Sequence, residues 1–294
     1  MVLVDSPRRV RTLQWTLAVL DAGIGGYALF TKLTGQAQVE GSRAALVGLL
    51  GDPNDLAFTL LMSAPFLIAA AWTGEVRTRR RARILLVLVV GGILSTQSRG
   101  GLLALAAGGG LVMFDRIRSK AVVVGIMVVG LGLAGAVSGL ADRQSGAVGG
   151  GHEELDESAQ GRLDAWKAGG RMLMRNPIDG VGFNRFADNY ESYASNVVIW
   201  GKHETHNAYI KCAAETGVIG LLPFLALVFL SLRASLRCRA LASRFEPADA
   251  TLLSTQLANL AGLLVSAFFL SQTWMWFLYI LFFNAATTAE IYTI

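Results

Sequence analysis

Cysteine and charged side chains are both scarce in this sequence. Only two cysteines, Cys212 and Cys238, occur in 294 residues, and 16% of the residues are charged. Two cysteines cannot build a disulfide framework, and no metal-ligand spacing surrounds them, so neither a disulfide scaffold nor a metal site is expected. The low charge accompanies 53% hydrophobic residues and a mean hydropathy of +0.48, which excludes an ordinary soluble domain. The chain is therefore expected in a membrane.

The basic residues lie in short clusters beside apolar runs. One cluster precedes the first apolar run at Arg8, Arg9 and Arg11, and a denser one, RTRRRAR, occupies residues 77–83. Membrane proteins orient themselves by such clusters, so the net charge of +5 is interpreted as a topology signal and no nucleic-acid partner is expected. No small-residue cleavage site follows the first cluster, which favours a retained first span over a signal peptide.

Eight apolar segments are long enough to be considered as membrane spans. They cover residues 12–30, 56–72, the two halves of 84–114, 121–140, 208–232, 252–270 and 274–289. The segment 84–114 is divided by a polar break at residues 95–101 and has basic groups at both ends, so it is expected to form a hairpin with the break on the far side of the membrane. The pattern predicts an all-α polytopic membrane protein of about eight transmembrane helices, with both termini cytoplasmic.

Residues 141–205 form the one long hydrophilic stretch. It holds ten acidic residues against seven lysines and arginines, whereas the rest of the chain holds eleven against nineteen. This asymmetry places the stretch outside the cytoplasm. The predicted organisation has three parts: five spans in residues 1–140, an extracytoplasmic loop in 141–205, and three spans in 206–294.

The loop contains a predicted amphipathic helix over residues 158–175, which Asn176-Pro177 ends. Its apolar stripe comprises Leu163, Trp166, Gly170 and Leu173, and its polar stripe comprises Asp164, Lys167, Arg171 and Arg175. Such a helix is expected to lie on the membrane surface. Arg162 is one helical turn before Trp166, so we expect it to face the membrane side as well.

The stretch HETHNAYIKCAAETGVIG, residues 203–220, sets polar residues at the mouth of a long apolar run. His206-Asn207 is followed by nine residues and then by Gly217-Val218-Ile219-Gly220. This spacing resembles the H[N/S/Q]-x9-G-x-x-G signature of the O-antigen ligase and polymerase family. Members of that family are bacterial membrane enzymes that transfer glycans from a polyprenyl-pyrophosphate carrier.

The resemblance extends over roughly residues 50–225. Ser98-Arg99 through Leu103 is similar to the family's R-x3-L motif, and Asp52-Pro53-Asn54 before a span is a familiar pattern in these proteins. The segment from Arg162 to Gly182 is similar to the family's large loop, in which an arginine contacts the carrier pyrophosphate in relatives. Relatives carry more spans, and this chain resembles them from about their fifth span onward. The earlier spans are therefore expected to be absent, dispensable or supplied by another chain.

The residues that carry the resemblance suit glycan transfer. Arg99 and Arg162 would hold the diphosphate on which negative charge builds as the sugar leaves. His206 would remove the proton of the attacking hydroxyl or orient the acceptor, because histidine titrates near neutrality. The remaining substrate-binding candidates are Asn207, Ser98, Trp166, Arg171 and His203. The resemblance implies inversion at the anomeric carbon without a metal or other cofactor.

Purely structural interpretations stay open for these residues. Arg99 could be an interfacial anchor, Arg162 a surface arginine, and His206 or Asn207 a helix cap. Asp52 and Asp55 fit a turn before a helix better than a cation site. The pair Lys211 and Glu215 has the spacing of a structural ion pair.

Two other functions are weighed against transfer. In a transporter or a scaffold subunit of a polysaccharide export system, buried charged residues would line a path through the membrane. Here the ionisable residues cluster at the outer ends of the spans. A membrane serine protease using Ser138-Gly139 and His206 lacks the expected glycine at position 136.

The expected location is the bacterial cytoplasmic membrane, with the site at its outer face. The expected partners are a lipid-linked glycan donor, a glycan or lipid acceptor, membrane lipid, and other polysaccharide-assembly membrane proteins. The sequence does not separate ligase from polymerase.

Overall fold

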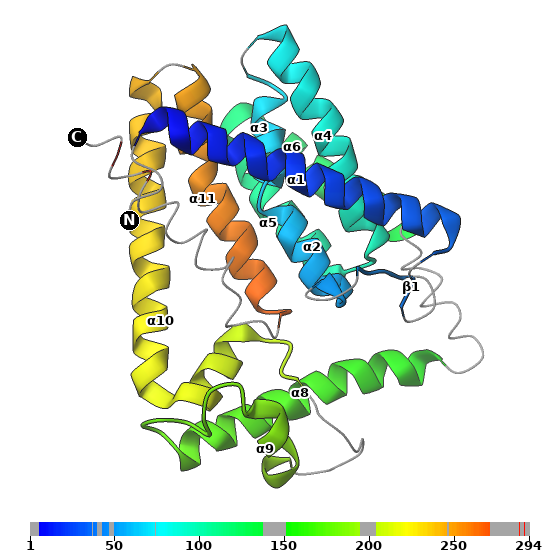
Figure 1. The fold of residues 1–294 in the computed structure, drawn as a ribbon, viewed down its shortest axis with the longest axis vertical. Coiled ribbons are helices and arrows are strands. Elements are labelled where there is room, and N and C mark those ends of the chain that lie inside the picture. The colour runs from blue at the N-terminus through cyan, green and yellow to red at the C-terminus, as the bar shows by residue number, and fades with distance from the viewer. Residues whose placement is uncertain are drawn as a thin grey trace. The chain divides into compact units, whose positions relative to one another are not determined.

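A computed structural model describes residues 6–36, 38–39, 43–46, 50–73, 75–137, 151–194, 204–245, 247–270, 288 and 291. Within these residues the secondary structure is helical apart from one two-stranded antiparallel ribbon, β1 (Gln38–Val39) and β2 (Arg43–Ala44) (Figure 1). The helices are α1 (Pro7–Thr34), α2 (Pro53–Leu61), α3 (Ala64–Ala70), α4 (Val76–Ser95), α5 (Arg99–Arg116), α6 (Lys120–Val137), α8 (Gly151–Arg175), α9 (Phe186–Tyr193), α10 (Ala208–Leu241), the 3₁₀ turn η3 (Ala242–Arg244) and α11 (Pro247–Ala267). The all-α fold class is confirmed.

Three of the described helical segments are both long enough and apolar enough to cross a membrane: Pro53–Ala70, Ala208–Arg244 and Asp249–Ala267. They correspond to the second, sixth and seventh predicted spans. Helices α1, α4, α5 and α6 also lie where spans are predicted. The predicted eighth span, 274–289, lies almost wholly outside the described residues, and the total of eight stays a prediction.

The hairpin predicted over 84–114 is present as α4 and α5. Helix α4 ends at Ser95 and α5 begins at Arg99, so the break falls at the polar residues that predict it. Gln97 within the break has a φ of 51°, a conformation that non-glycine residues seldom adopt. The basic cluster 77–83 is helical and forms the first turns of α4.

The chain divides into two compact units. Unit 1 comprises Met1–Ser138, Leu230–Ser266 and Trp276–Ile294, and unit 2 comprises Gly139–Phe229 and Ala267–Met275. Unit 2 therefore combines the predicted loop with the first part of α10. Each unit is described by itself below.

Close helix packing forms the core of unit 1. Helices α1 and α4 meet at Gly25 and Gly92: a Cβ built on Gly92 would lie 2.5 Å from the Gly25 Cα, too close for any side chain. Small residues let helices approach in this way in membranes, where packing rather than water exclusion drives association. Elsewhere on α1 the Trp15 ring meets the Phe66 ring of α3 edge to face at 5.2 Å. Helix α11 joins through Ala258, which packs with Ala69 and Val112.

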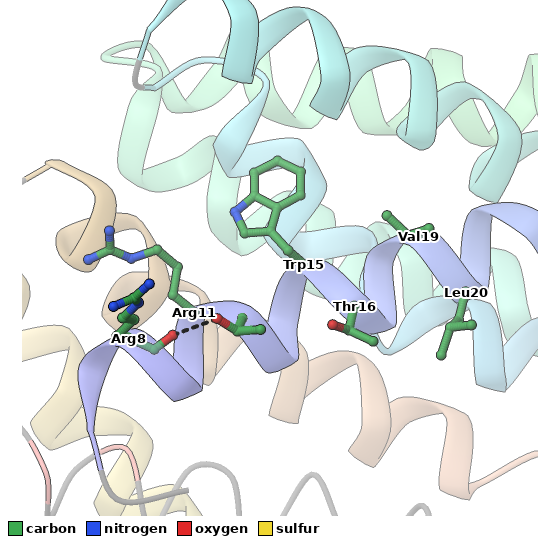
Figure 2. A pocket seen from close by; sticks show the side chains of 7 residues that line it. Arg8, Arg11, Trp15, Thr16, Val19 and Leu20 are labelled. Atoms are coloured by element: carbon green, nitrogen blue, oxygen red, sulfur yellow. Dashed lines mark hydrogen bonds between the residues drawn. The ribbon is translucent and has the colours of Figure 1, made fainter.

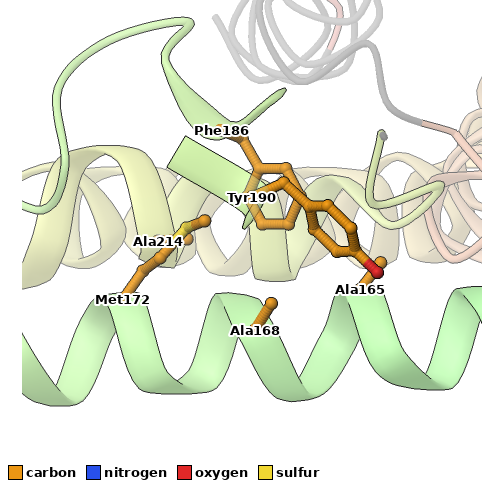
Figure 3. Packing of buried hydrophobic residues seen from close by; sticks show 6 residues of the cluster. All are labelled: Ala165, Ala168, Met172, Phe186, Tyr190 and Ala214. Atoms are coloured by element: carbon orange, nitrogen blue, oxygen red, sulfur yellow. The ribbon is translucent and has the colours of Figure 1, made fainter. Parts of the chain in front are cut away.

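Unit 2 has its own small core, formed where α8 faces α9 and the start of α10. The buried residues are Ala165, Ala168, Met172, Phe186, Tyr190 and Ala214 (Figure 3). Burial raises the pKa of the Tyr190 hydroxyl, nearby Asp164 raises it further, and Arg171 opposes the shift. The hydroxyl is therefore neutral at physiological pH.

This core shows which face of α8 is covered by protein, and the predicted contact of the apolar stripe with the membrane stays a prediction. The helix ends at Arg175 as predicted. Its buried stripe, however, comprises Ala165, Ala168 and Met172 rather than the predicted apolar stripe, of which Leu163 is 46% exposed. The reason is that α9 and α10 cover the stripe of small residues, and short side chains permit that close approach. The predicted stripe remains partly exposed.

Candidate functional site

The residues around His206 form a tight turn that starts α10. The Asn207 side-chain oxygen accepts hydrogen bonds from the backbone N–H groups of Tyr209 (3.0 Å) and Ile210 (3.1 Å). Asn207 is thus the N-cap of the helix and satisfies two of its free donors. The Thr205 hydroxyl donates to the Asn207 carbonyl oxygen over 3.1 Å, and both residues are buried. The capping role weighed for Asn207 is confirmed.

His206 lies between these two anchored residues and is half-buried. Its φ of 45° falls in the left-handed region, which only a few per cent of non-glycine residues adopt, histidine more often than most. Such strain persists only where the surroundings hold it, and it concentrates at functional sites. The turn therefore fixes the direction in which the imidazole leaves the backbone.

Helix α8 is attached to the same turn. The indole Nε1 of Trp166 donates to the Thr205 carbonyl oxygen over 2.9 Å. Arg162 is half-buried and precedes Trp166 by four residues, so the two side chains share one face of α8. This brings Arg162 within one helical turn of the residue that is bonded to the His206 turn. Trp166 has a structural role here, and its predicted contact with substrate stays a prediction.

Arg171 belongs to a different part of α8. Nine residues, or two and a half helical turns, separate it from Arg162, so the two arginines lie on opposite faces of the helix. Arg171 donates to the carbonyl oxygen of Tyr193 at the end of α9, and Asn176 donates to the Tyr193 hydroxyl over 3.0 Å. The structure thus gives Arg171 a role in joining α8 to α9, away from His206.

Gly217, the first glycine of the motif, interrupts α10, which corrects the expectation of one continuous span over 208–232. At Gly217 the backbone adopts φ 56° and ψ −154°, which ends the first nine helical residues. A Cβ on Gly217 would lie 2.4 Å from the Ile178 carbonyl oxygen, so only glycine fits. Nine helical residues extend only about 14 Å, so this first segment cannot cross a bilayer alone.

The loop that follows α8 satisfies the backbone groups left free by this break. Val181 and Gly182 donate N–H bonds to the carbonyl oxygens of Ala214 (2.9 Å) and Glu215 (3.0 Å). In the other direction Val218 donates to the Pro177 carbonyl oxygen over 2.8 Å. The nine-residue spacing of the motif therefore has a physical reason: it is the length of helix between the Asn207 cap and the break that receives this loop.

Three ionised side chains reinforce the same junction. Lys211 is 5% exposed and donates to Glu204 over 2.8 Å, and its Nζ lies 3.9 Å from Glu215, which is fully buried. The Glu215 carboxylate also accepts the backbone N–H groups of Asn184 (3.1 Å) and Phe186 (3.0 Å), at the start of α9. The predicted Lys211–Glu215 pair is confirmed, and its role is to join α10 to α9.

The second candidate region is the α4–α5 break in unit 1. Ser98 caps α5: its Oγ accepts the Gly101 N–H at 3.0 Å and donates to the Asn54 side-chain oxygen at 2.7 Å. Asp52 caps α2 by accepting the Asn54 N–H at 2.7 Å, in agreement with the predicted turn before a helix. The predicted motifs at 52–54 and 98–103 are therefore bonded to each other.

Arg43, which the sequence analysis did not single out, holds this region together. Only 7% of it is exposed. Its Nε donates to the Thr96 carbonyl oxygen over 3.0 Å, and its Nη2 donates to the Asn54 side-chain oxygen over 3.3 Å. The guanidinium therefore connects the β-ribbon, α2 and the α4–α5 break. In the sequence the one signal for it is an arginine in the polar stretch between two predicted spans.

Arg99 is the first residue of α5, directly after Ser98, and its side chain is exposed. A cation with five donors at the start of a helix suits a phosphate oxygen. Arg99 belongs to unit 1, whereas Arg162 and His206 belong to unit 2. The meeting of all three stays a prediction. His203 lies outside the described residues.

A groove of about 580 Å³ runs along α1, lined by Arg8, Arg11, Thr12, Trp15, Thr16, Val19 and Leu20 (Figure 2). It contains none of the predicted site residues. Among the described residues no group of three histidine, cysteine, aspartate or glutamate side chains could hold a metal ion.

The helical fold, the apolar candidate spans and the polar turns define the chain as a helical membrane protein with a folded hydrophilic unit. Residues 84–225 match the model of the family Wzy_C, described as O-antigen ligase. This match confirms the resemblance to the O-antigen ligase family that the His206 motif gives. The match contains every predicted site residue, and it supports a glycan-transferring membrane enzyme in general terms.

The other comparisons add no functional argument. No curated protein matches the sequence. A chain of the solved structure described as "Structural coordination of polymerization and crosslinking by a peptidoglycan synthase complex" is 19% identical. The alignment covers 98% of this chain and 82% of that chain, with a TM-score of 0.48. A similarity at this level carries no conclusion.

Proposed function

We propose that the protein transfers a saccharide chain from undecaprenyl pyrophosphate to an acceptor hydroxyl at the outer face of the bacterial cytoplasmic membrane. The observation that carries the proposal is the His206 turn. The motif that identifies the family places a histidine on a strained backbone, between a buried threonine and a capping asparagine. A fixed imidazole of this kind suits proton transfer in a defined direction.

In the proposed reaction the acceptor oxygen attacks the anomeric carbon of the lipid-linked sugar. The new glycosidic bond forms as the bond to the pyrophosphate breaks, and the electron pair stays on the pyrophosphate oxygen. His206 receives the hydroxyl proton. Arg99 and Arg162 hold the diphosphate and stabilise its developing charge, so no metal ion or cofactor is needed. Attack from the opposite side inverts the anomeric configuration.

The two arginines differ in how they would be supported. Arg99 projects from a helix start that Ser98, Asn54 and Arg43 fix by hydrogen bonds. Arg162 lies on α8, which Trp166 attaches to the His206 turn. The two proposed donor-binding cations are therefore held by separate sets of hydrogen bonds.

The test uses the full chain reconstituted in liposomes with an undecaprenyl-pyrophosphate-linked oligosaccharide and a glycan or lipid acceptor pool. The expected products are a saccharide joined to the acceptor and free undecaprenyl pyrophosphate in equal amounts, both followed by mass spectrometry. The yield should be unchanged by a chelator, and NMR of the new linkage should show the inverted anomer. Failure of the chain to form product when supplemented with an N-terminal half from a longer family member would overturn the proposal.

A further inference from the structure

Three large apolar side chains project from the end of α8 and the loop after it. Met174 is 74% exposed, Ile178 is 65% exposed and Phe183 is 62% exposed. We call these three residues the apolar tip. They lie within ten residues of one another in the sequence, and none of them is in the buried core cluster of unit 2. A soluble domain seldom presents such a group of side chains to water.

The tip is distinct from the core on the same helix. Met172 is fully buried against α9 and α10, whereas Met174, two residues later, is the most exposed residue of the tip. Two residues correspond to about 200° around a helix, so these methionines point in nearly opposite directions. The end of α8 therefore has one apolar side that is covered by protein and another that is not.

Backbone hydrogen bonds connect the tip to the start of a membrane span. Ile219 donates its N–H to the Ile178 carbonyl oxygen over 3.2 Å, beside the bond from Val218 to Pro177. The second segment of α10 begins here and runs into the most apolar of the candidate spans. The side chains of Ile219 (65% exposed), Leu222 (60%) and Phe229 (62%) on this segment are largely exposed as well. The exposed apolar surface thus continues from the span onto the tip.

We propose that the apolar tip inserts into the lipid bilayer, at the boundary between headgroups and acyl chains, and seats unit 2 on the membrane. A span must contact lipid along its exposed face, and Ile178 is bonded to the residues at which that face begins. Arg175 and Arg185 flank the tip and are exposed, which suits anionic headgroups. This inference depends on the membrane spans and not on the proposed glycan transfer.

Seating by the tip would also fix the depth of the His206 turn, because both belong to unit 2. The Ile178 carbonyl oxygen accepts the N–H of Ile219, just after the nine-residue helical segment ends. The Asn207 cap lies at the other end of that segment. The turn is therefore held a short, fixed length of helix away from the lipid boundary.

The test is spin-label depth measurement on the full chain in bilayers of phosphatidylethanolamine and phosphatidylglycerol. Labels are placed singly through Met174→Cys, Ile178→Cys and Phe183→Cys. Matched controls on the same unit use the exposed residues Lys167, Asp188 and Glu191, each changed to cysteine. The native Cys212 and Cys238 are buried, so the unmodified chain measures the background labelling.

We expect the tip labels to collide with oxygen several-fold more, relative to a water-soluble nickel chelate, than the control labels do. The unfolding temperature of each labelled variant in detergent should equal that of the parent, since all six positions are exposed. Equal nickel access at tip and control positions would overturn the proposal. So would low access of both oxygen and the nickel chelate to the tip labels, because a protein surface, unlike lipid, excludes both probes.

Discussion

The Trp166 indole nitrogen lies 2.9 Å from the Thr205 carbonyl oxygen, so α8 is bonded to the residue that immediately precedes His206. Thirty-nine residues separate the two partners in the sequence. One hydrogen bond thus connects the helix that carries Arg162 to the turn that carries His206, the two predicted site residues of unit 2.

Replacing Trp166 with phenylalanine should weaken the His206 turn. The variant keeps an aromatic ring but removes the donor, which leaves the buried Thr205 carbonyl oxygen unpaired at a cost of about 1–3 kcal/mol. We expect a lower unfolding temperature in detergent and slower transfer. Trp72→Phe is the matched control, because Trp72 is 47% exposed. Equal behaviour of the two variants would show that the bond does not hold the turn.

Gly217→Ala should be among the most damaging single-methyl changes in unit 2. The substituted residue would have to keep a φ of 56° and would overlap the Ile178 carbonyl oxygen at 2.4 Å. Strain and overlap together should cost more than about 2 kcal/mol. Gly170→Ala on α8 meets nothing within 4 Å and should be neutral or stabilising by up to about 1 kcal/mol. Thermal unfolding of the two variants measures the contrast, and a stable Gly217→Ala would refute the break.

These two predictions show where sequence reasoning succeeds and where it stops. Polar residues that bond to their own neighbours were identifiable: Asn207 as a cap, and Asp52 in the turn before a helix. The break at Gly217 was not, because hydropathy continues unchanged through it and a glycine in an apolar run is ordinary. What makes the break is the loop at 177–182, whose approach no local pattern reveals.

The same limit explains Arg43 and the buried face of α8. Arg43 is 53 residues from Thr96, so nothing in its own neighbourhood indicates the partner. On α8 the sequence predicted an apolar stripe but not the face covered by protein, because the stripe of small residues is selected by how closely α9 and α10 approach. Long-range contacts, rather than composition, decide both cases.

The buried ion pair in unit 2 should show strong non-additivity. Lys211→Met leaves the Glu215 carboxylate buried without its cation and should cost about 3–5 kcal/mol. Adding Glu215→Gln to that variant removes the uncompensated charge while an amide oxygen can still accept from α9. We therefore expect the double variant to be more stable than Lys211→Met alone, as measured by unfolding in detergent. A double variant as unstable as the sum of the singles would show that the two residues do not interact.

Arg43 and Arg99 should respond differently to the same substitution. Arg43→Lys keeps the charge but cannot reach both the Thr96 and Asn54 oxygens, so stability and transfer should both fall. Arg99 is exposed, so Arg99→Lys should leave the unfolding temperature unchanged and reduce transfer alone. Measuring unfolding temperature and transfer for both variants separates the structural role of Arg43 from the proposed contact of Arg99 with the donor. A loss of stability in Arg99→Lys would assign it a structural role.

The central claim, that His206 and Arg99 act on one substrate, is tested most directly by transfer in membranes that contain the chain and an undecaprenyl-pyrophosphate glycan pool. His206→Ala and Arg99→Ala are compared with the native chain and with Lys167→Ala, an exposed cation on α8, at equal expression. We predict a loss of at least about a hundredfold for each of the first two variants, as expected for a proton-transfer group and a charge-stabilising donor, and no loss for Lys167→Ala. Native activity that survives either substitution would contradict the account.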